Sequence, residues 1–243
     1  MGVEEREALD KACRPQGLSG LDVAHLQSHI GCDSITMARA GARVTAIDFS
    51  PTALARAESL ARECGVELTC VLADSRDLPL ELSCSFDIVY ATIGVLCWID
   101  DLDAWMSGVA RILRPGGRLV LVDLHPLFQM IDTVAPLVID FPYNFDGVRE
   151  YVSSGSYADR DLPVTSVTHQ FAHGLAEIIM AAVHQSLTVI DAVEHTSMSF
   201  DPRGSMLQLN PDGRYELRMT SGSEGHPSEP LPVLFSFIAE RPR

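Results

Sequence analysis

Lysine is almost absent from this chain. Lys11 is its only lysine, and 18 basic residues face 33 acidic ones, which gives a formal net charge of -15. The arginines are scattered along the sequence rather than clustered. Because affinity for a phosphate backbone comes from clustered lysine and arginine, we expect no nucleic-acid partner.

Long apolar runs are also lacking. No window approaches the roughly 20 apolar residues of a membrane span. The acidic start, Met1 to Glu5, lacks the basic and apolar regions of a signal peptide. We therefore expect a cytoplasmic protein without a membrane partner.

The cysteines show no paired spacing of the kind that holds a metal. Most of them fall on stretches that we expect to be buried strands or helices, so reduced thiols and no metal site are predicted. The six cysteines are Cys13, Cys32, Cys64, Cys70, Cys84 and Cys97.

The glycine fingerprint of dinucleotide-binding folds is missing too. Of its three glycines, the segment 27–31 keeps only Gly31, which disfavours an ordinary NAD enzyme. The surrounding pattern nevertheless predicts a strand over 21–26, a tight turn, and a helix that is capped by Asp33-Ser34 and stops at Gly41.

A second strand is predicted over 43–47, and it ends at Asp48. Open α/β sheets bind ligands at the carboxyl ends of their strands, where a carboxylate suits two vicinal ribose hydroxyls. The spacing from Gly31 to Asp48, with a helix between them, therefore predicts a nucleoside site. The alternative is that Gly31 is an ordinary turn glycine.

The rest of the chain continues the alternation of helices and strands. Ser50 and Pro51 mark the start of a helix that ends at Gly65. Further strands are predicted over 66–72, 86–90, 119–124, 187–193 and 233–239. Helices are predicted over 4–16, 51–64, 102–113 and 175–183, and a hairpin near 215–219.

Several motifs resemble those of class I S-adenosylmethionine-dependent methyltransferases. These are Asp48 at a strand end, the Ala73-Asp74-Ser75 element and the Leu-Arg-Pro-Gly-Gly turn at 113–117, in their usual order. The segment 25–33 resembles a small-molecule subgroup whose first motif reads His-Leu-Gln-Cys-His-Ile-Gly-x-Asp, with Ser28 as the departure. His25 stands where many relatives carry an acidic residue.

The resemblance implies a Rossmann-like, doubly wound α/β fold. Its sheet would have seven mostly parallel strands with an antiparallel last strand. We expect one domain over 1–243, with an N-terminal cap over 1–20 and a lid insertion after the fifth strand, over 126–168. That segment is long and has no sustained hydrophobic period, as expected of a binding loop.

The resemblance also implies a site for S-adenosyl-L-methionine. Gly31 and the neighbouring backbone would face its methionine portion, Asp48 would bind the ribose, and Asp74 would accept a hydrogen bond from the adenine amino group. Phe49 would pack on the adenine. The full predicted set is Gln27, His29, Gly31, Asp33, Asp48, Phe49, Asp74, Ser75 and Ile93.

Methyl transfer from a sulfonium is an in-line displacement, so alignment supplies much of the acceleration and a base is needed only for some acceptors. The predicted bases are His125, which follows the fifth strand, and then His29 and His173; His169 is a further candidate. Each could instead cap or pack. Tyr157 could orient a substrate or anchor a lid, and the two tryptophans fit a packing role.

The leading prediction is a methyltransferase that acts on a small molecule, in specialised metabolism by analogy with the family. The fourth strand ends in Ala91-Thr92-Ile93-Gly94 and lacks the Asn-Pro-Pro-Tyr pattern of base or amide methylation. Alternatives are a non-methylating reaction on the same fold, such as cyclisation or elimination, and a non-catalytic partner subunit. A homodimer and a complex with a partner enzyme both stay open.

Overall fold

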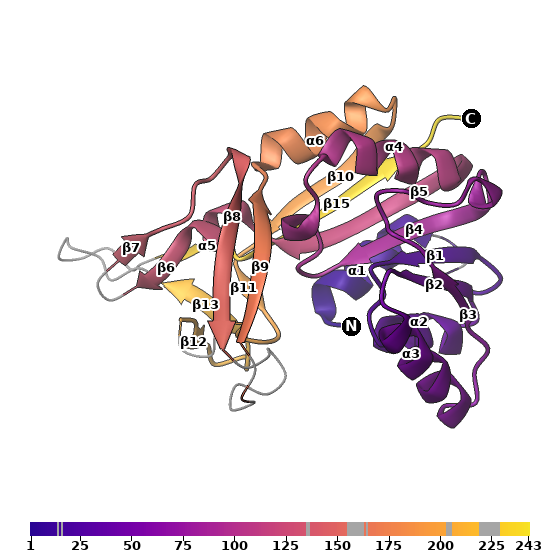
Figure 1. The fold of residues 1–243 in the computed structure, drawn as a ribbon, viewed down its shortest axis with the longest axis horizontal. Helices are drawn as coiled ribbons and strands as arrows, with labels where there is room; N and C mark the ends of the chain where they lie inside the picture. Colours follow the sequence, from indigo (N-terminus) through magenta and orange to yellow (C-terminus); the bar gives the residue numbers. More distant parts are fainter. Residues whose placement is uncertain are drawn as a thin grey trace.

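A seven-stranded sheet organises the computed structural model, which describes residues 1–13, 15, 17–134, 137–154, 163, 165–202, 206–218 and 229–243. Its strand order is β10-β15-β5-β4-β1-β2-β3 (Figure 1). Only β15 runs antiparallel to its neighbours among these strands. The bounds are β1 Asp22–Leu26, β2 Arg43–Asp48, β3 Thr69–Leu72, β4 Phe86–Thr92, β5 Leu113–Leu124, β10 Thr188–His195 and β15 Leu234–Glu240.

This sheet confirms the predicted doubly wound fold. The chain builds β1, β2 and β3 outward in one direction and then returns to place β4 on the other side of β1. The switch point between β1 and β4 is where such sheets bind ligands, at the carboxyl ends of the strands.

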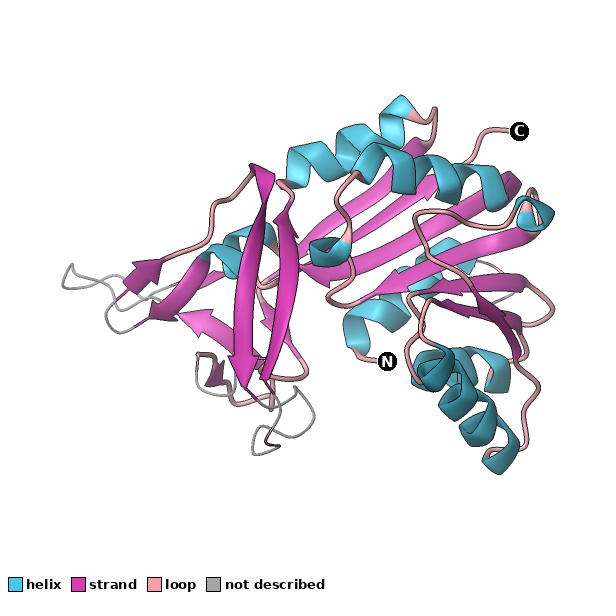
Figure 2. Ribbon diagram, viewed as in Figure 1, coloured by secondary structure: helices cyan, strands magenta, loops and turns pink. Residues whose placement is uncertain are grey.

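Helices cover both faces of the sheet (Figure 2). Helices α4 and α6 pack together on one face, and α1 and α2 cover the other, with α3 beside α2. The bounds are α1 Val3–Cys13, α2 Cys32–Arg39, α3 Pro51–Glu63, α4 Leu102–Ile112 and α6 Leu175–His184.

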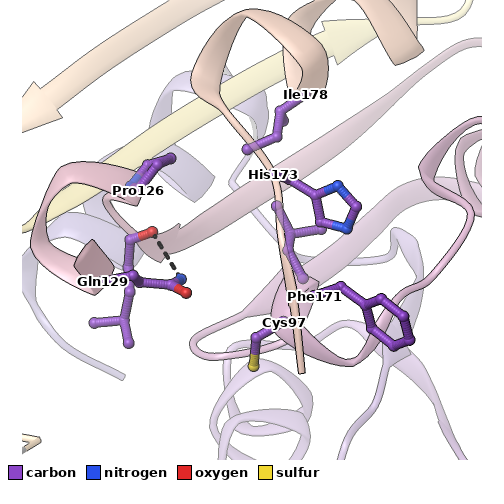
Figure 3. Close-up of a pocket in the computed structure, with 8 residues that line it drawn as sticks. Cys97, Pro126, Gln129, Phe171, His173 and Ile178 are labelled. Carbon is purple, nitrogen blue, oxygen red and sulfur yellow. Dashed lines mark hydrogen bonds between the residues drawn. The ribbon is translucent and has the colours of Figure 1, made fainter. Parts of the chain in front are cut away.

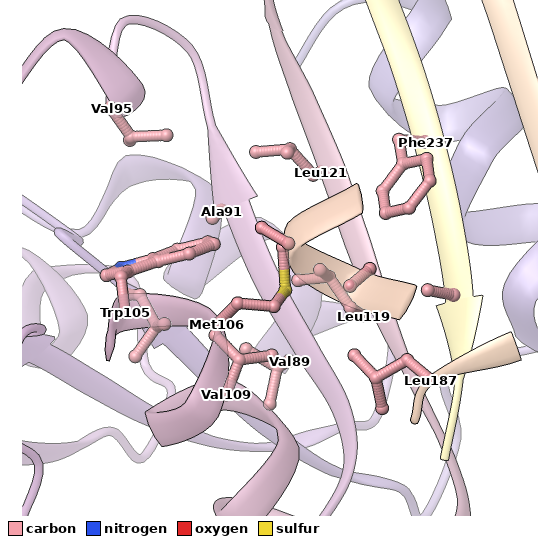
Figure 4. Close-up of a cluster of buried hydrophobic side chains, with 14 of the residues drawn as sticks. Val89, Ala91, Val95, Trp105, Met106, Val109, Leu119, Leu121, Leu187 and Phe237 are labelled. Atoms are coloured by element: carbon pink, nitrogen blue, oxygen red, sulfur yellow. The ribbon is translucent and has the colours of Figure 1, made fainter. Parts of the chain in front are cut away.

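Alternate residues of β4 enter the two cores, as expected for a strand that is buried on both faces. Val89 and Ala91 join Trp105 and Met106 of α4 in the larger core (Figure 4). Tyr90 enters the opposite core, beneath α1 and α2. Trp105 is fully buried, which confirms its predicted packing role.

The start of α3 confirms its predicted cap, because Ser50 Oγ accepts a hydrogen bond from the N–H of Ala53 at 3.2 Å. The predicted cap of α2, by Asp33-Ser34, was wrong. The N-cap is Gly31, in a left-handed conformation with no side-chain cap, and Asp33 already lies inside the first turn. The side chain of Asp33 is thereby available for another role.

The strands beyond β5, apart from β10 and β15, form smaller sheets at the carboxyl ends of β4 and β5 (Figure 1). In its described residues, the segment predicted to lack regular structure contains a helix, three complete strands and the start of β9, and β8 pairs with β9 in a long antiparallel ribbon. The bounds are α5 Pro126–Met130, β6 Ile131–Val134, β7 Leu137–Ile139, β8 Phe145–Ser154, β9 Thr165–Ala172, β11 Ser197–Met198, β12 Gln208–Leu209, β13 Tyr215–Arg218 and β14 Pro230–Leu231.

Three further expectations have different outcomes: one is not met, one is met in part and one is not tested. Trp98, in the short 3-10 helix η2 Leu96–Trp98, is 44% exposed rather than packed. All six cysteines are free, as predicted, but only Cys13 is buried among them. Tyr157 lies outside the described residues. Within the described residues, no helix is both long and apolar enough to cross a membrane.

Candidate active site

The turn between β1 and α2 has a left-handed backbone at every second residue. Gln27, His29 and Gly31 have φ values of 52°, 50° and 74°. Left-handed backbone suits glycine and strains other residues by about 1–2 kcal/mol each. A Cβ at Gly31 would also lie 2.8 Å from the Cβ of Ala57 in α3, so this position requires glycine.

Asp48 holds this turn from the end of β2. Its carboxylate accepts the backbone N–H of His29 at 2.8 Å and the N–H of Ser50 at 2.9 Å. The N–H of Ala73, after β3, donates to the Asp48 carbonyl at 3.1 Å. Asp48 therefore joins the ends of three neighbouring strands.

Two residues beside Asp48 face solvent. Phe49 is 72% exposed, which is unusual for a large aromatic side chain and leaves its ring free to stack on a flat ligand. Asp74 follows β3 and is paired with Arg76 at 2.7 Å, which lowers the pKa of the Asp74 carboxyl. Arg76 also reaches Asp100 at 3.3 Å. Ser75 is buried next to Asp74.

Between β1 and β4 lies a group of buried polar side chains. His25 Nδ1 is 2.7 Å from Ser34 Oγ, and the His25 ring meets the edge of Tyr90 at 5.1 Å. Burial lowers the pKa of His25 to about 4, although Asp33 and Asp48 oppose that shift. His25 is consequently uncharged at neutral pH.

The loop after β4 is held by hydrogen bonds to β5 on one side and to the turn after β1 on the other. Asp123, fully buried near the end of β5, accepts the backbone N–H groups of Gly94, Val95 and Leu96, the last two at 3.1 and 2.9 Å. Burial raises the pKa of Asp123, and these donors oppose the shift. Gln27 Nε2 donates to the carbonyl of Val95 at 3.1 Å. Ile93 is partly buried under this loop.

The histidine predicted to be the leading base is engaged at both ring nitrogens. His125 Nδ1 accepts the N–H of Leu127 at 3.1 Å and so caps α5, while Nε2 lies 2.8 Å from Glu194. A neutral ring with its proton on Nε2 satisfies both partners. The base role of His125 stays a prediction, since it requires the cap to open.

His173 is similarly engaged, with Nε2 at 2.7 Å from the carbonyl of Ile99 and Nδ1 at 3.1 Å from Glu177. Both ring nitrogens of His173 therefore already have a partner within the protein. His169 lies exposed on β9, 3.7 Å from Glu150.

A cavity of about 10 Å³ lies where η2, α5, β9 and α6 meet. This volume is about what one buried water molecule needs. Figure 3 shows Cys97, Phe171 and His173 around it, with Ile178 on α6 and the Gln129 side chain directed to the Leu124 carbonyl. The cavity marks the junction between the main sheet and the smaller strands.

The structure thus divides the predicted residues into two groups. The turn residues, Asp33 and Asp48 gather at the carboxyl ends of β1 and β2, with Asp74 and Phe49 beside them. His125 and His173 lie instead on the side of the smaller strands. Within the described part of the chain, no group of histidine, cysteine and carboxylate residues has the arrangement of a metal site.

Sequence reasoning missed the buried hydroxyl of Tyr90 and the clamp that Asp123 forms. Tyr90 sits mid-strand in an apolar run, and nothing in that pattern shows which face it takes. Arg76 was missed too, although a basic residue two positions after Asp74 in a turn is a usable signal.

Comparison with known proteins shows similarity over part of the chain. Residues 28–121 match the family described as methyltransferase domain. A ubiquinone biosynthesis O-methyltransferase from Xanthomonas oryzae pv. oryzae is 34% identical over 117 residues, 48% of each chain. A malonyl-[acyl-carrier protein] O-methyltransferase from Hahella chejuensis is 38% identical over 91 residues, 37% of this chain and 31% of that protein. The chain spans about half the length, or less, of these relatives.

Solved structures share the whole fold. An S-adenosylmethionine-dependent methyltransferase from Clostridium acetobutylicum superposes with a TM-score of 0.65 at 16% identity, covering 100% of this chain and 93% of the other. The [4+2]-cyclase SpnF superposes with a TM-score of 0.59 at 14% identity, covering 92% of this chain and 76% of the other. At these identities the likeness establishes the fold alone.

Proposed function

Since residues 28–121 match the family of methyltransferase domains, we propose that the chain is an S-adenosylmethionine-dependent methyltransferase that acts on a small molecule. The observation that carries the proposal is the placement of Asp48. It ends β2 next to the left-handed turn after β1, with the exposed ring of Phe49 beside it. A carboxylate and an aromatic face at this edge suit a ribose and an adenine.

The residues present fit this cofactor. Each Asp48 oxygen accepts one backbone N–H and keeps a lone pair for a ribose hydroxyl. The turn has no Cβ at Gly31, and the first N–H groups of α2 lie beyond it, where a helix start favours a carboxylate. The cofactor supplies an activated methyl group when bound.

At the adenine end, Asp74 shares its oxygens with Arg76. In the proposed complex Arg76 keeps its contact with Asp100 and yields an Asp74 oxygen to the adenine amino group.

The smaller strands supply the acceptor side of the site. β9 packs against η2, and the β8–β9 ribbon lies over the carboxyl end of the main sheet (Figure 1). We assign it the role of a lid, which excludes water and aligns the acceptor. An acidic chain with one lysine supports a small acceptor rather than a nucleic acid.

The test combines calorimetry with an activity screen. Titration with S-adenosylhomocysteine should show binding at one site. Incubation of the protein with S-adenosylmethionine and a panel of phenols, carboxylic acids and amines should yield S-adenosylhomocysteine with at least one acceptor. If the protein binds neither S-adenosylmethionine nor S-adenosylhomocysteine, the proposal is refuted.

Cyclisation is the second candidate, because a [4+2]-cyclase shares the fold along most of this chain. The two are distinguished by the product. A cyclase converts its substrate without forming S-adenosylhomocysteine, whereas a methyltransferase forms one for each turnover.

A further inference from the structure

The charged part of the proposed cofactor needs a carboxylate that β1 does not provide. Its methionine portion carries an ammonium group, and burying an ammonium without a counter-charge is costly. His25, near the end of β1, is 4% exposed and uncharged at neutral pH. Its Nδ1 is committed to Ser34. His25 therefore shapes the crevice without balancing a charge.

Three carboxylates near the switch point are engaged elsewhere. Asp48 accepts two backbone N–H groups on the β2 side. Asp123 is fully buried among the N–H groups of the loop after β4. Glu5 of α1 is 6% exposed, and burial raises its pKa.

Asp33 differs from these three. Its side chain is 19% exposed, and Oδ1 lies 2.8 Å from the amino group of Met1. Its other oxygen, Oδ2, lies 3.5 Å from the hydroxyl of Thr92 at the end of β4. This carboxylate already accommodates a primary ammonium in a largely enclosed position.

A second observation points to a ligand at the same place. The hydroxyl of Tyr90 lies beside Asp33 and Thr92, is fully buried, and makes no hydrogen bond of good geometry. A ligand group that reaches this hydroxyl would give it a hydrogen bond of better geometry than Asp33 and Thr92 provide. Asp33 comes from α2, which follows β1, and Thr92 and Tyr90 come from β4.

We propose that Asp33 binds the ammonium group of the cofactor's methionine portion, with the hydroxyls of Thr92 and Tyr90 beside it. This inference rests on the proposed function. Asp33 takes this place because α2 begins at a left-handed Gly31 rather than at a side-chain cap, which brings the second helical residue over the end of β4. The amino group of Met1 leaves Asp33 when the cofactor binds.

The test uses two ligands that differ only in the ammonium. Calorimetry compares S-adenosylhomocysteine with its analogue in which hydrogen replaces the amino group. For Asp33→Asn, which keeps the shape of the side chain, affinity for S-adenosylhomocysteine should fall about 10-fold or more, as expected for a lost charge-assisted pair. Affinity for the analogue should stay within about twofold, a margin too small to reflect a lost contact.

Asp48→Asn is the matched control, because it should weaken both ligands alike. The inference is overturned if Asp33→Asn binds S-adenosylhomocysteine as wild type does, or if it weakens both ligands equally. If wild type binds neither ligand, the proposed function itself fails. Should Asp33→Asn not fold, Thr92→Val gives the same comparison, with a selective loss of about threefold for S-adenosylhomocysteine expected from one neutral hydrogen bond.

Discussion

The Asp48 carboxylate and the His29 backbone N–H lie 2.8 Å apart, so the end of β2 and the strained turn after β1 form one unit. A ligand that binds Asp48 therefore meets a turn that is already in place. This preorganisation lowers the cost of ordering the site on binding.

Asp48→Ala should weaken S-adenosylhomocysteine binding by about 1.5–3 kcal/mol, because the variant loses hydrogen bonds to a charged acceptor. Asp48→Asn keeps one acceptor oxygen and should weaken binding less. Calorimetry at constant pH measures both. Equal affinity of Asp48→Ala and wild type would contradict the ribose assignment.

The left-handed backbone at His29 predicts that a glycine at this position stabilises the fold. His29→Gly should raise the free energy of unfolding by about 0.5–1 kcal/mol, because glycine relieves the strain at φ 50° and offsets its own entropy cost. Ser186→Gly, at φ 60° after α6, is the control and should give a similar gain. Urea unfolding measures both changes.

The same pair of variants tests the predicted cofactor contact of His29. Affinity for S-adenosylhomocysteine should fall in His29→Gly and stay unchanged in Ser186→Gly. Unchanged affinity in both would remove His29 from the cofactor site.

His25 predicts a pH dependence of stability. Its pKa is about 4 in the fold and near 6.5 when unfolded, so between these values the unfolded chain binds a proton that the folded chain does not. Stability is therefore lost as pH falls through this window, by about 2 kcal/mol at pH 5.

The comparison with His25→Gln isolates this effect, because Asp33 and Asp48, the charged groups that face His25, are present in both proteins. Urea unfolding at pH 7.5 and pH 5 should show a steeper loss in wild type than in the variant. Parallel losses would show that His25 is not buried as an uncharged ring.

The variant His125→Ala distinguishes a structural role of this histidine from a catalytic one. His125→Ala removes the cap of α5 and the contact with Glu194, and should lower the free energy of unfolding by about 1–3 kcal/mol. If His125 is also the base predicted from the sequence, turnover per folded molecule at saturating cofactor and acceptor should fall by about 100-fold. Unchanged turnover per folded molecule would rule out the base role and leave the cap of α5 as the role of His125.

The lid assignment predicts slower hydrogen exchange in β8 and β9 when cofactor and acceptor are both present, because closure shields the ribbon. Amides of β4 and β5, central in the sheet, serve as the internal control and should change little. Equal exchange of the ribbon with and without ligands would rule out closure.

The sequence predicted the region from β1 to β2 well because local signals there agree. Apolar runs, Gly41 after the helix and Asp48 at a strand end all favour the same fold, and the structure confirms these elements. The start of α2 was predicted wrongly because Asp33-Ser34 has the chemistry of a cap, whereas the cap is set by the backbone of Gly31.

Two features could not be read from residue patterns. Gln27 and His29 are left-handed although neither is glycine, and contacts from other elements hold them there: Asp48 binds the His29 N–H and Val95 binds Gln27. The β8–β9 ribbon was missed because it is largely exposed, with apolar residues such as Val152 and Val167 facing outward. A strand without one buried face lacks the alternation that identifies strands.

Asp123 also bears on how this protein could acquire new acceptors. Its hydrogen bonds hold the loop after β4 against β5, and a substitution that removes the acceptor oxygens leaves several buried N–H groups without this partner. Mutations that reshape this wall are therefore costly to the whole fold. If the chain is the proposed methyltransferase, selection for a different acceptor therefore has more freedom to act on the outer strands than on this wall.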